Sequence, residues 1–206
     1  MKLEKNENDK PLDNRVTDKE VEEAFVNIIK WIGEDPSREG LKSTPKRLMK
    51  AYKEYFKGYN EDPKKILNKT FGDVQGYDDM VIQKNISLQS HCEHHMAPII
   101  GVAHLSYIPN QRVVGLSKLA RLVEVFAKRL QIQEKLTAQI ANAIDEVLQP
   151  KGVGVIIEAS HLCVSTRGIH KPESRMVTSR MLGSFRNDQA TRKEFLDLVG
   201  FNKSKF

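Results

Sequence analysis

Residues 91 to 95 place four side chains that can bind a metal or move a proton within five positions. The stretch reads HCEHH, and a second pair, His161 and Cys163, follows much later in the chain. Imidazole and thiolate are ligands that zinc takes readily in proteins. We interpret the two clusters as halves of one zinc site.

Cys92 and Cys163 are the only cysteines in the sequence, so a disulfide between them is one interpretation. Each has a histidine two or three positions away, however, which favours shared metal ligation in a reduced compartment. Cys92-x-x-His95 is a close chelating pair, whereas Cys163 lies 71 residues further on (163 − 92). Zinc fingers place their second pair much closer and include two ligands in it. Three protein ligands plus a water is therefore the better count.

Two further histidines lie beside the presumed ligands. His91 and His95 are four apart, but Glu93 is misplaced for a helical H-E-x-x-H metalloprotease motif, and the β-rich flanking sequence opposes a helix. This leaves His94 and His161. In one interpretation they bind the metal or support a metal ligand. In the other they carry protons, as imidazoles with a pKa of about 6.5 can do. Two histidines flanking one metal favour proton transfer.

The charge of the chain predicts an anionic partner. The net charge is +6 and the pI is about 9.2, which suits a nucleic acid or a phosphorylated small molecule. Lys118 and Arg121 follow Gly115-Leu116-Ser117 at the start of a predicted helix, where free N–H groups favour an anion. Arg167, four residues after Cys163, can bring a third positive charge towards the metal.

Gln133 and Glu134 offer a different kind of contact. A carboxylate can accept two hydrogen bonds from the N1–H and the amine of guanine, and an amide can complement it. From the residues alone, an exposed glutamate at the start of a helix is the simpler interpretation. Both interpretations of Glu134 stay open at this point.

Composition predicts a globular protein with one main core and an appendage. The chain has 206 residues, of which 39% are hydrophobic and 29% charged, and no apolar run approaches the roughly 20 residues of a membrane helix. The first twenty residues are charged and lack the apolar segment of a secretory signal, so we expect a cytoplasmic protein. We divide it into a flexible tail (1–16), a helical N-terminal extension (17–70) and a catalytic domain (71–206).

Periodicity predicts the elements that must position these residues. A capping box at Thr17 starts one helix, Thr44 caps a second with Pro45 at its first position, and Asp62 can start a short third. If the strand ending near residue 160 continues, His161 and Cys163 share one face. We expect further elements in this order: strands at 81–88 and 98–108, helices after 115 and after 130, strands at 153–160 and 177–182, and a helix capped by Asp188.

Four motifs together closely resemble the GTP cyclohydrolase I family, in consistent order over about residues 17 to 200. They are SHCEHHM at 90–96, GLSKLAR at 115–121, QIQE at 131–134 and SHLCVSTRG at 160–168. Motifs this dense are highly specific. The resemblance implies a zinc enzyme that opens the imidazole ring of GTP, releases C8 as formate and forms 7,8-dihydroneopterin triphosphate, the first step towards folate-type pterins.

The resemblance also implies a role for each site residue. Cys92, His95 and Cys163 would hold zinc, which would activate a water for attack on C8. His161 would protonate N7 and His94 would assist proton transfer during ring opening. The remaining residues would bind the substrate. Glu134, with Gln133, would hold the guanine edge, and Ser117 would lie near the ribose. The triphosphate would be bound by Lys118, Arg121, Arg167 and, from a neighbouring subunit, Arg47.

The fold implied by the resemblance is the α+β tunnelling fold. In that fold an antiparallel sheet is backed by two helices, the sheets of several subunits join into a barrel, and a helical extension precedes them. Family members form a decamer of two pentamers with active sites at subunit interfaces. The expected partners are therefore GTP and further copies of the chain, with no nucleic acid and no membrane.

Two alternatives stay open. A zinc-stabilised nucleic-acid-binding module would explain the basic pI, but it requires a closed set of four ligands, and aromatic residues make up only 7% of the chain. A related pterin-pathway enzyme of the same fold would share Glu134. The cysteine-histidine-cysteine ligand set, together with Ser117, Lys118 and Arg121, distinguishes the GTP-cleaving family from it.

Overall fold

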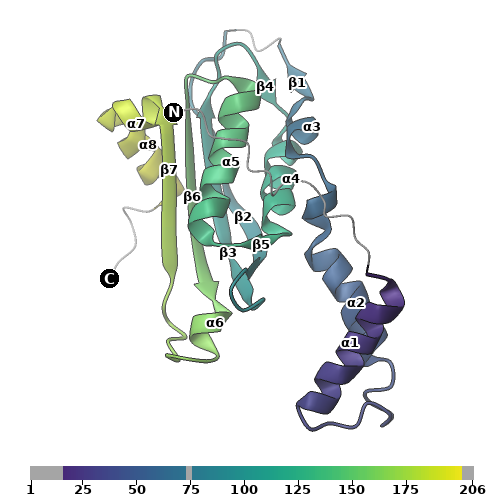
Figure 1. The fold of residues 1–206 in the computed structure, drawn as a ribbon. Helices are drawn as coiled ribbons and strands as arrows, with labels where there is room; N and C mark the ends of the chain where they lie inside the picture. Colours follow the sequence, from purple (N-terminus) through teal and green to yellow (C-terminus); the bar gives the residue numbers. More distant parts are fainter. Residues whose placement is uncertain (1–15, 73–75, 201–206) are drawn as a thin grey trace.

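A five-stranded sheet forms the centre of the molecule (Figure 1). The computed structural model describes residues 16–72 and 76–200, so the predicted tail lies almost wholly outside the described residues. Four strands are antiparallel, and a two-residue strand at one edge runs parallel to its neighbour. In spatial order the strands are β5 (Leu130–Gln131), β2 (Val81–Cys92), β3 (Pro98–Ile108), β6 (Gly152–His161) and β7 (Met176–Gly183).

Two amphipathic helices cover one face of the sheet and build the main core. They are α4 (Leu116–Ala127) and α5 (Gln133–Leu148), which pack on β2 and on β6 and β7 respectively. Alternate residues of β3 turn towards them, and Leu105 and Tyr107 are almost completely buried there. Both faces of β6 are covered for much of its length, and its sequence is correspondingly apolar throughout.

The opposite face is only partly covered. The C-terminal helices α7 (Ser184–Asn187) and α8 (Gln189–Val199) bring Phe185 and Phe195 onto Ile156, their rings in edge-to-face contact at 5.5 Å. Gly154 makes room for them, because a Cβ there would lie 2.9 Å from the ring of Phe195. Elsewhere on the sheet large apolar residues stay open to solvent, including Ile100 at 48% exposure.

The N-terminal helices extend away from the sheet (Figure 1). α1 (Asp18–Trp31) and α2 (Thr44–Tyr55) pack on each other through Phe25 and Tyr52, and a 3₁₀ turn, η2 (Lys57–Asn60), and α3 (Pro63–Leu67) follow. β1 (Thr70–Phe71) then pairs with β4 (Val113–Val114). Trp31 is 84% exposed, so part of the apolar face of this helix pair is not covered by any of the residues that the structure describes.

Most predicted elements are confirmed. The capping box at Thr17, the start of α3 after Asp62 and the cap of α8 by Asp188 all form. The cap of α2 is wrong by one residue: Ser43 is the N-cap, and Thr44 is already helical. The α+β arrangement is compatible with the predicted tunnelling fold. Among the described residues, no helix combines the length and apolar character that a membrane crossing requires.

Candidate metal centre and active site

Strand register brings the two predicted clusters together. β3 lies between β2 and β6, and Ile99 is paired on one side with Ser90 and on the other with His161. Because neighbouring strands lie about 4.8 Å apart, Ser90 and His161 are about 10 Å from each other. Cys92 follows Ser90 by two residues and Cys163 follows His161 by two. The chain thus closes the 71-residue gap (163 − 92) between the cysteines at one end of the sheet.

Cys92, His95 and Cys163 form the candidate metal centre. One ligand atom from each lies within 4.8 Å of the others, and Nδ1 of His95 is 3.9 Å from Sγ of Cys92. Ligands of a tetrahedral zinc at about 2.0–2.3 Å lie about 3.3–3.8 Å apart, so small movements complete the site. Burial, and then the nearby Cys92 thiol, raise the pKa of Cys163. A cation between the two sulfurs would reverse that effect, so the donor set fits zinc.

Cys163 reaches this position differently from the sequence prediction. His161 and Cys163 would share one face if the strand continued through both. β6 instead ends at His161, and Cys163 lies in a short helix, α6 (Leu162–Ser165). The condition for a shared face is therefore not met. The turn into α6 carries the thiol towards Cys92, while His161 stays at the end of the sheet.

His161 and His94 lie next to the metal centre. Nε2 of His161 is 2.8 Å from Oε1 of Gln133, and burial lowers the pKa of His161, so the neutral ring is favoured near pH 7. His94 is exposed, and its Nδ1 lies 3.7 Å from Sγ of Cys92. His94 thus contacts a predicted ligand, and His161 lies two residues before another.

The two residues of the 91–95 stretch that have no predicted chemical role make structural contacts. His91 is buried, with its ring 4.7 Å from the ring of Tyr55 and 5.3 Å from that of Phe56, so it joins the end of α2 to the metal centre. Glu93 forms an ion pair with Lys135 at 2.6 Å. This pair ties the loop after β2 to the first turn of α5.

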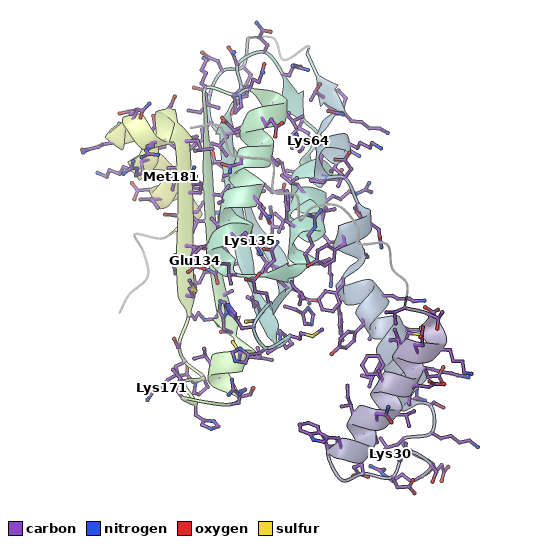
Figure 2. All side chains as sticks on the ribbon, viewed as in Figure 1. Lys30, Lys64, Glu134, Lys135, Lys171 and Met181 are labelled. Carbon is purple, nitrogen blue, oxygen red and sulfur yellow. The ribbon has the colours of Figure 1, made fainter. Side chains whose placement is uncertain are left out.

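Gln133 and Glu134 begin α5 at the same end of the sheet, where Figure 2 labels Glu134 and Lys135. Glu134 is exposed, so its carboxylate is available to a ligand. Gln133 is only 1% exposed, and its amide bonds four protein atoms, including Nε2 of His161. A guanine contact through the Gln133 side chain would have to displace one of these bonds.

The predicted phosphate-binding residues of α4 lie far from the metal centre of their own chain. Ser117, Lys118 and Arg121 belong to the first half of α4, whereas Cys92 pairs with β5, just after the helix ends. At about 1.5 Å per residue, Ser117 lies about 15 Å along the helix from its end and Arg121 about 9 Å. Arg121 instead lines a cavity of about 540 Å³ between α4 and β2, together with Gln83 and Lys84.

The two remaining predicted arginines are exposed but differ in position. Arg167 follows α6 and lies near enough to Cys163 to lower the pKa of that thiol, although burial outweighs this effect. Arg47 lies in α2, within the projecting helix pair. A single chain therefore brings together the three predicted ligands, both histidines, Glu134 and Arg167, but not the residues of α4.

Sequence reasoning missed several residues that hold the site. The clearest are Thr137 and Thr178, whose hydroxyls contact each other at 2.6 Å and both bond Gln133. Only the spacing of four between Gln133 and Thr137 on one helix hinted at such a contact. Thr178 comes from β7, and nothing local to the sequence links it to α5.

Comparisons with known proteins agree with these observations. The family model for GTP cyclohydrolase I matches residues 21–200. GTP cyclohydrolase 1 of Pelagibacter ubique (strain HTCC1062) is 60% identical over 200 residues, which cover 97% of this chain and 99% of the relative. The proteins of the same name from Hyphomonas neptunium and Maricaulis maris are 55% and 54% identical, covering 90% and 87% of this chain and 90% and 88% of their own lengths.

The first prediction separates the metal ligands from their neighbour. Cys163→Ala removes one of three ligands, so we expect zinc affinity to fall by at least about a hundredfold, beyond the usual effect of a residue that only supports a ligand. His161→Ala should retain zinc. The measurement is metal content after dialysis against a weak chelator, with affinity from competition titration. Equal zinc loss in both variants would make His161 a ligand.

Proposed function

This chain belongs to the GTP cyclohydrolase I family of hydrolases, and from that membership we propose that it is a zinc-dependent enzyme acting on GTP at C8. It opens the imidazole ring, releases formate and yields 7,8-dihydroneopterin triphosphate, the first step towards tetrahydrofolate and related pterins. The observation that carries the proposal is the convergence of Cys92, His95 and Cys163 beside His161 at one end of the sheet.

The metal ligands support hydrolysis because they number three. Cys92, His95 and Cys163 would supply three of the four ligands of a tetrahedral zinc. Zinc bound there supplies Lewis acidity, which lowers the pKa of water towards neutrality. The two histidines then divide the proton transfers: His161 protonates N7 so that C8 becomes electrophilic, and His94 assists ring opening.

The substrate contacts follow from charge and exposure. Glu134 accepts hydrogen bonds from the guanine edge, and Ser117 lies near the ribose during the later rearrangement. The triphosphate is bound by basic side chains, whose charges suit phosphate oxygens. These are Lys118, Arg121, Arg167 and Arg47, all but Lys118 being exposed in the single chain.

We propose that neighbouring copies of the chain complete the site. Ser117 and Lys118 lie at the start of α4, at the opposite end of that helix from β5 and Cys92, and we expect another subunit to present them, with Arg121, to the metal centre. β7 and most of β2 are open sheet edges, which predicts joining of sheets between subunits. Exposed apolar residues such as Trp31 and Ile100 also favour assembly. A decamer of two pentamers, with the sheets closed into a barrel, is the arrangement we propose.

Two coarser predictions belong to the same proposal. We assign a cytoplasmic location, where GTP and reduced thiols are both available. We also retain the division into a tail (1–16), a helical extension (17–70) and a catalytic domain (71–206). The projection of α1 and α2 away from the sheet supports it (Figure 1).

The proposed reaction gives two products that can be measured independently. Zinc-loaded protein incubated with GTP should release formate and, after oxidation and phosphatase treatment, a fluorescent neopterin in equal amount. His161→Ala should lower kcat by about 10²–10⁴-fold, the usual contribution of a general acid. A zinc-loaded, oligomeric sample that releases no formate from GTP would rule out the proposed activity.

A shared active site predicts complementation between inactive variants. Cys163→Ala lacks the metal centre and Lys118→Ala lacks a phosphate contact, so each alone should have little activity. Co-expressed in equal amounts, they form mixed oligomers in which about a quarter of the interfaces combine an intact metal centre with an intact Lys118. Activity should recover towards that fraction. Activity no higher than the sum of the two separate variants would place both residues in one subunit's site.

A further inference from the structure

The side-chain amide of Gln133 is held in one orientation. Its Nε2 lies 3.0 Å from the carbonyl oxygens of Ile157 and of Met176, and 3.1 Å from Oγ1 of Thr178. Carbonyl oxygens only accept hydrogen bonds, so the NH₂ end must face them. The reversed amide would bring three oxygens together in a site that is 1% exposed, which is unfavourable.

A ring of hydrogen bonds fixes this amide further. The hydroxyl of Thr137 donates to the main-chain carbonyl of Gln133 at 2.7 Å. Having one hydrogen, it must accept from Thr178 at 2.6 Å. Thr178 then accepts from the Gln133 amide, which closes a ring running from that amide through Thr178 and Thr137 to the Gln133 carbonyl. Each group polarises the next, so the ring is more rigid than separate bonds would be.

The fixed amide determines the state of His161. Only Oε1 of Gln133 faces this imidazole, at 2.8 Å from Nε2. An amide oxygen accepts, so Nε2 must carry a hydrogen. A neutral imidazole has one N–H and one lone pair, which leaves Nδ1 as the basic nitrogen. The bond to Gln133 persists when Nδ1 gains a proton, because Nε2 donates in both states.

We propose that Gln133 is a positioning residue for His161, and that the hydroxyls of Thr137 and Thr178 hold Gln133 in place. The amide fixes the imidazole as its Nε2–H form and leaves Nδ1 as the nitrogen through which a proton passes to and from the substrate. The catalytic part of this inference rests on the proposed function. The tautomer does not, because it follows from the hydrogen bonds of the protein alone.

The first measurement reads the tautomer without substrate. Zinc-loaded protein labelled with ¹⁵N-histidine is examined by solid-state NMR near pH 8, and the His161 signals are assigned by their loss in His161→Ala. We expect Nε2 protonated and Nδ1 bare. In Gln133→Leu, which removes the acceptor, we expect a mixture of the two forms. An Nδ1–H tautomer in the wild type would overturn the inference, whether or not the protein turns over GTP.

The second measurement separates positioning from substrate binding. Gln133→Leu should lower kcat by about 10–100-fold, the usual effect of losing a residue that orients a functional histidine, while KM changes by less than about threefold. A raised KM with unchanged kcat would make Gln133 a guanine-binding residue and overturn the proposal. Wild-type protein that releases no formate but has the Nε2–H form would contradict the proposed function and leave the tautomer assignment standing.

Two matched variants control for loss of folding. Gln131 is also 1% exposed and its amide also bonds a carbonyl, that of Phe126, but it does not contact His161. Gln131→Leu should therefore leave the His161 signals unchanged. Thr178→Val should give a mixture of His161 tautomers and lower kcat. Thr178→Ser should restore the Nε2–H form and the wild-type kcat. Identical effects of Gln131→Leu and Gln133→Leu on the His161 signals would refute a specific role for Gln133.

Discussion

The antiparallel register of β2, β3 and β6 is the constraint on which the rest of the site depends. Ser90, Ile99 and His161 form one row across three strands, so the C-terminal ends of β2 and β6 lie at the same end of the sheet. A shift by one residue would turn every side chain of a strand to the opposite face. The core on α4 and α5 prevents that shift, because it buries Leu105 and Tyr107 on one face only. The apolar packing of the sheet thereby fixes the geometry of its metal ligands.

The site is surrounded by contacts that hold the segments after these strand ends. The Glu93–Lys135 ion pair holds the loop after β2, His91 holds the end of α2, and Gln133 holds His161. Each of these contacts joins two different elements, so the site is fixed by tertiary packing and not by local sequence. A partly exposed ion pair alone contributes little to stability, and its role here is to limit the positions open to the loop.

How much the sequence predicts depends on how local the cause is. The capping box at Thr17, the strand 98–108 and the cap of α8 are set by neighbouring residues and were predicted correctly. Cys163 was misplaced, because alternation cannot reveal where a strand gives way to a helix. Lys118 was predicted to bind an anion from its place at a helix start, and resemblance assigned it to the triphosphate, but the direction of α4 places it away from the metal centre in a single chain. The bond from Gln133 to His161 joins two elements and had no local signal.

The central claim is that three protein ligands hold a zinc with one open position beside His161. A crystal structure of the zinc-loaded protein, with anomalous data collected at the zinc edge, tests it most directly. The account predicts that Cys92, His95 and Cys163 are the only side chains on the metal, that a water takes the fourth position, and that His161 bonds Gln133. A fourth side chain on the zinc, from His94 or His161, would contradict it and make the metal a structural one.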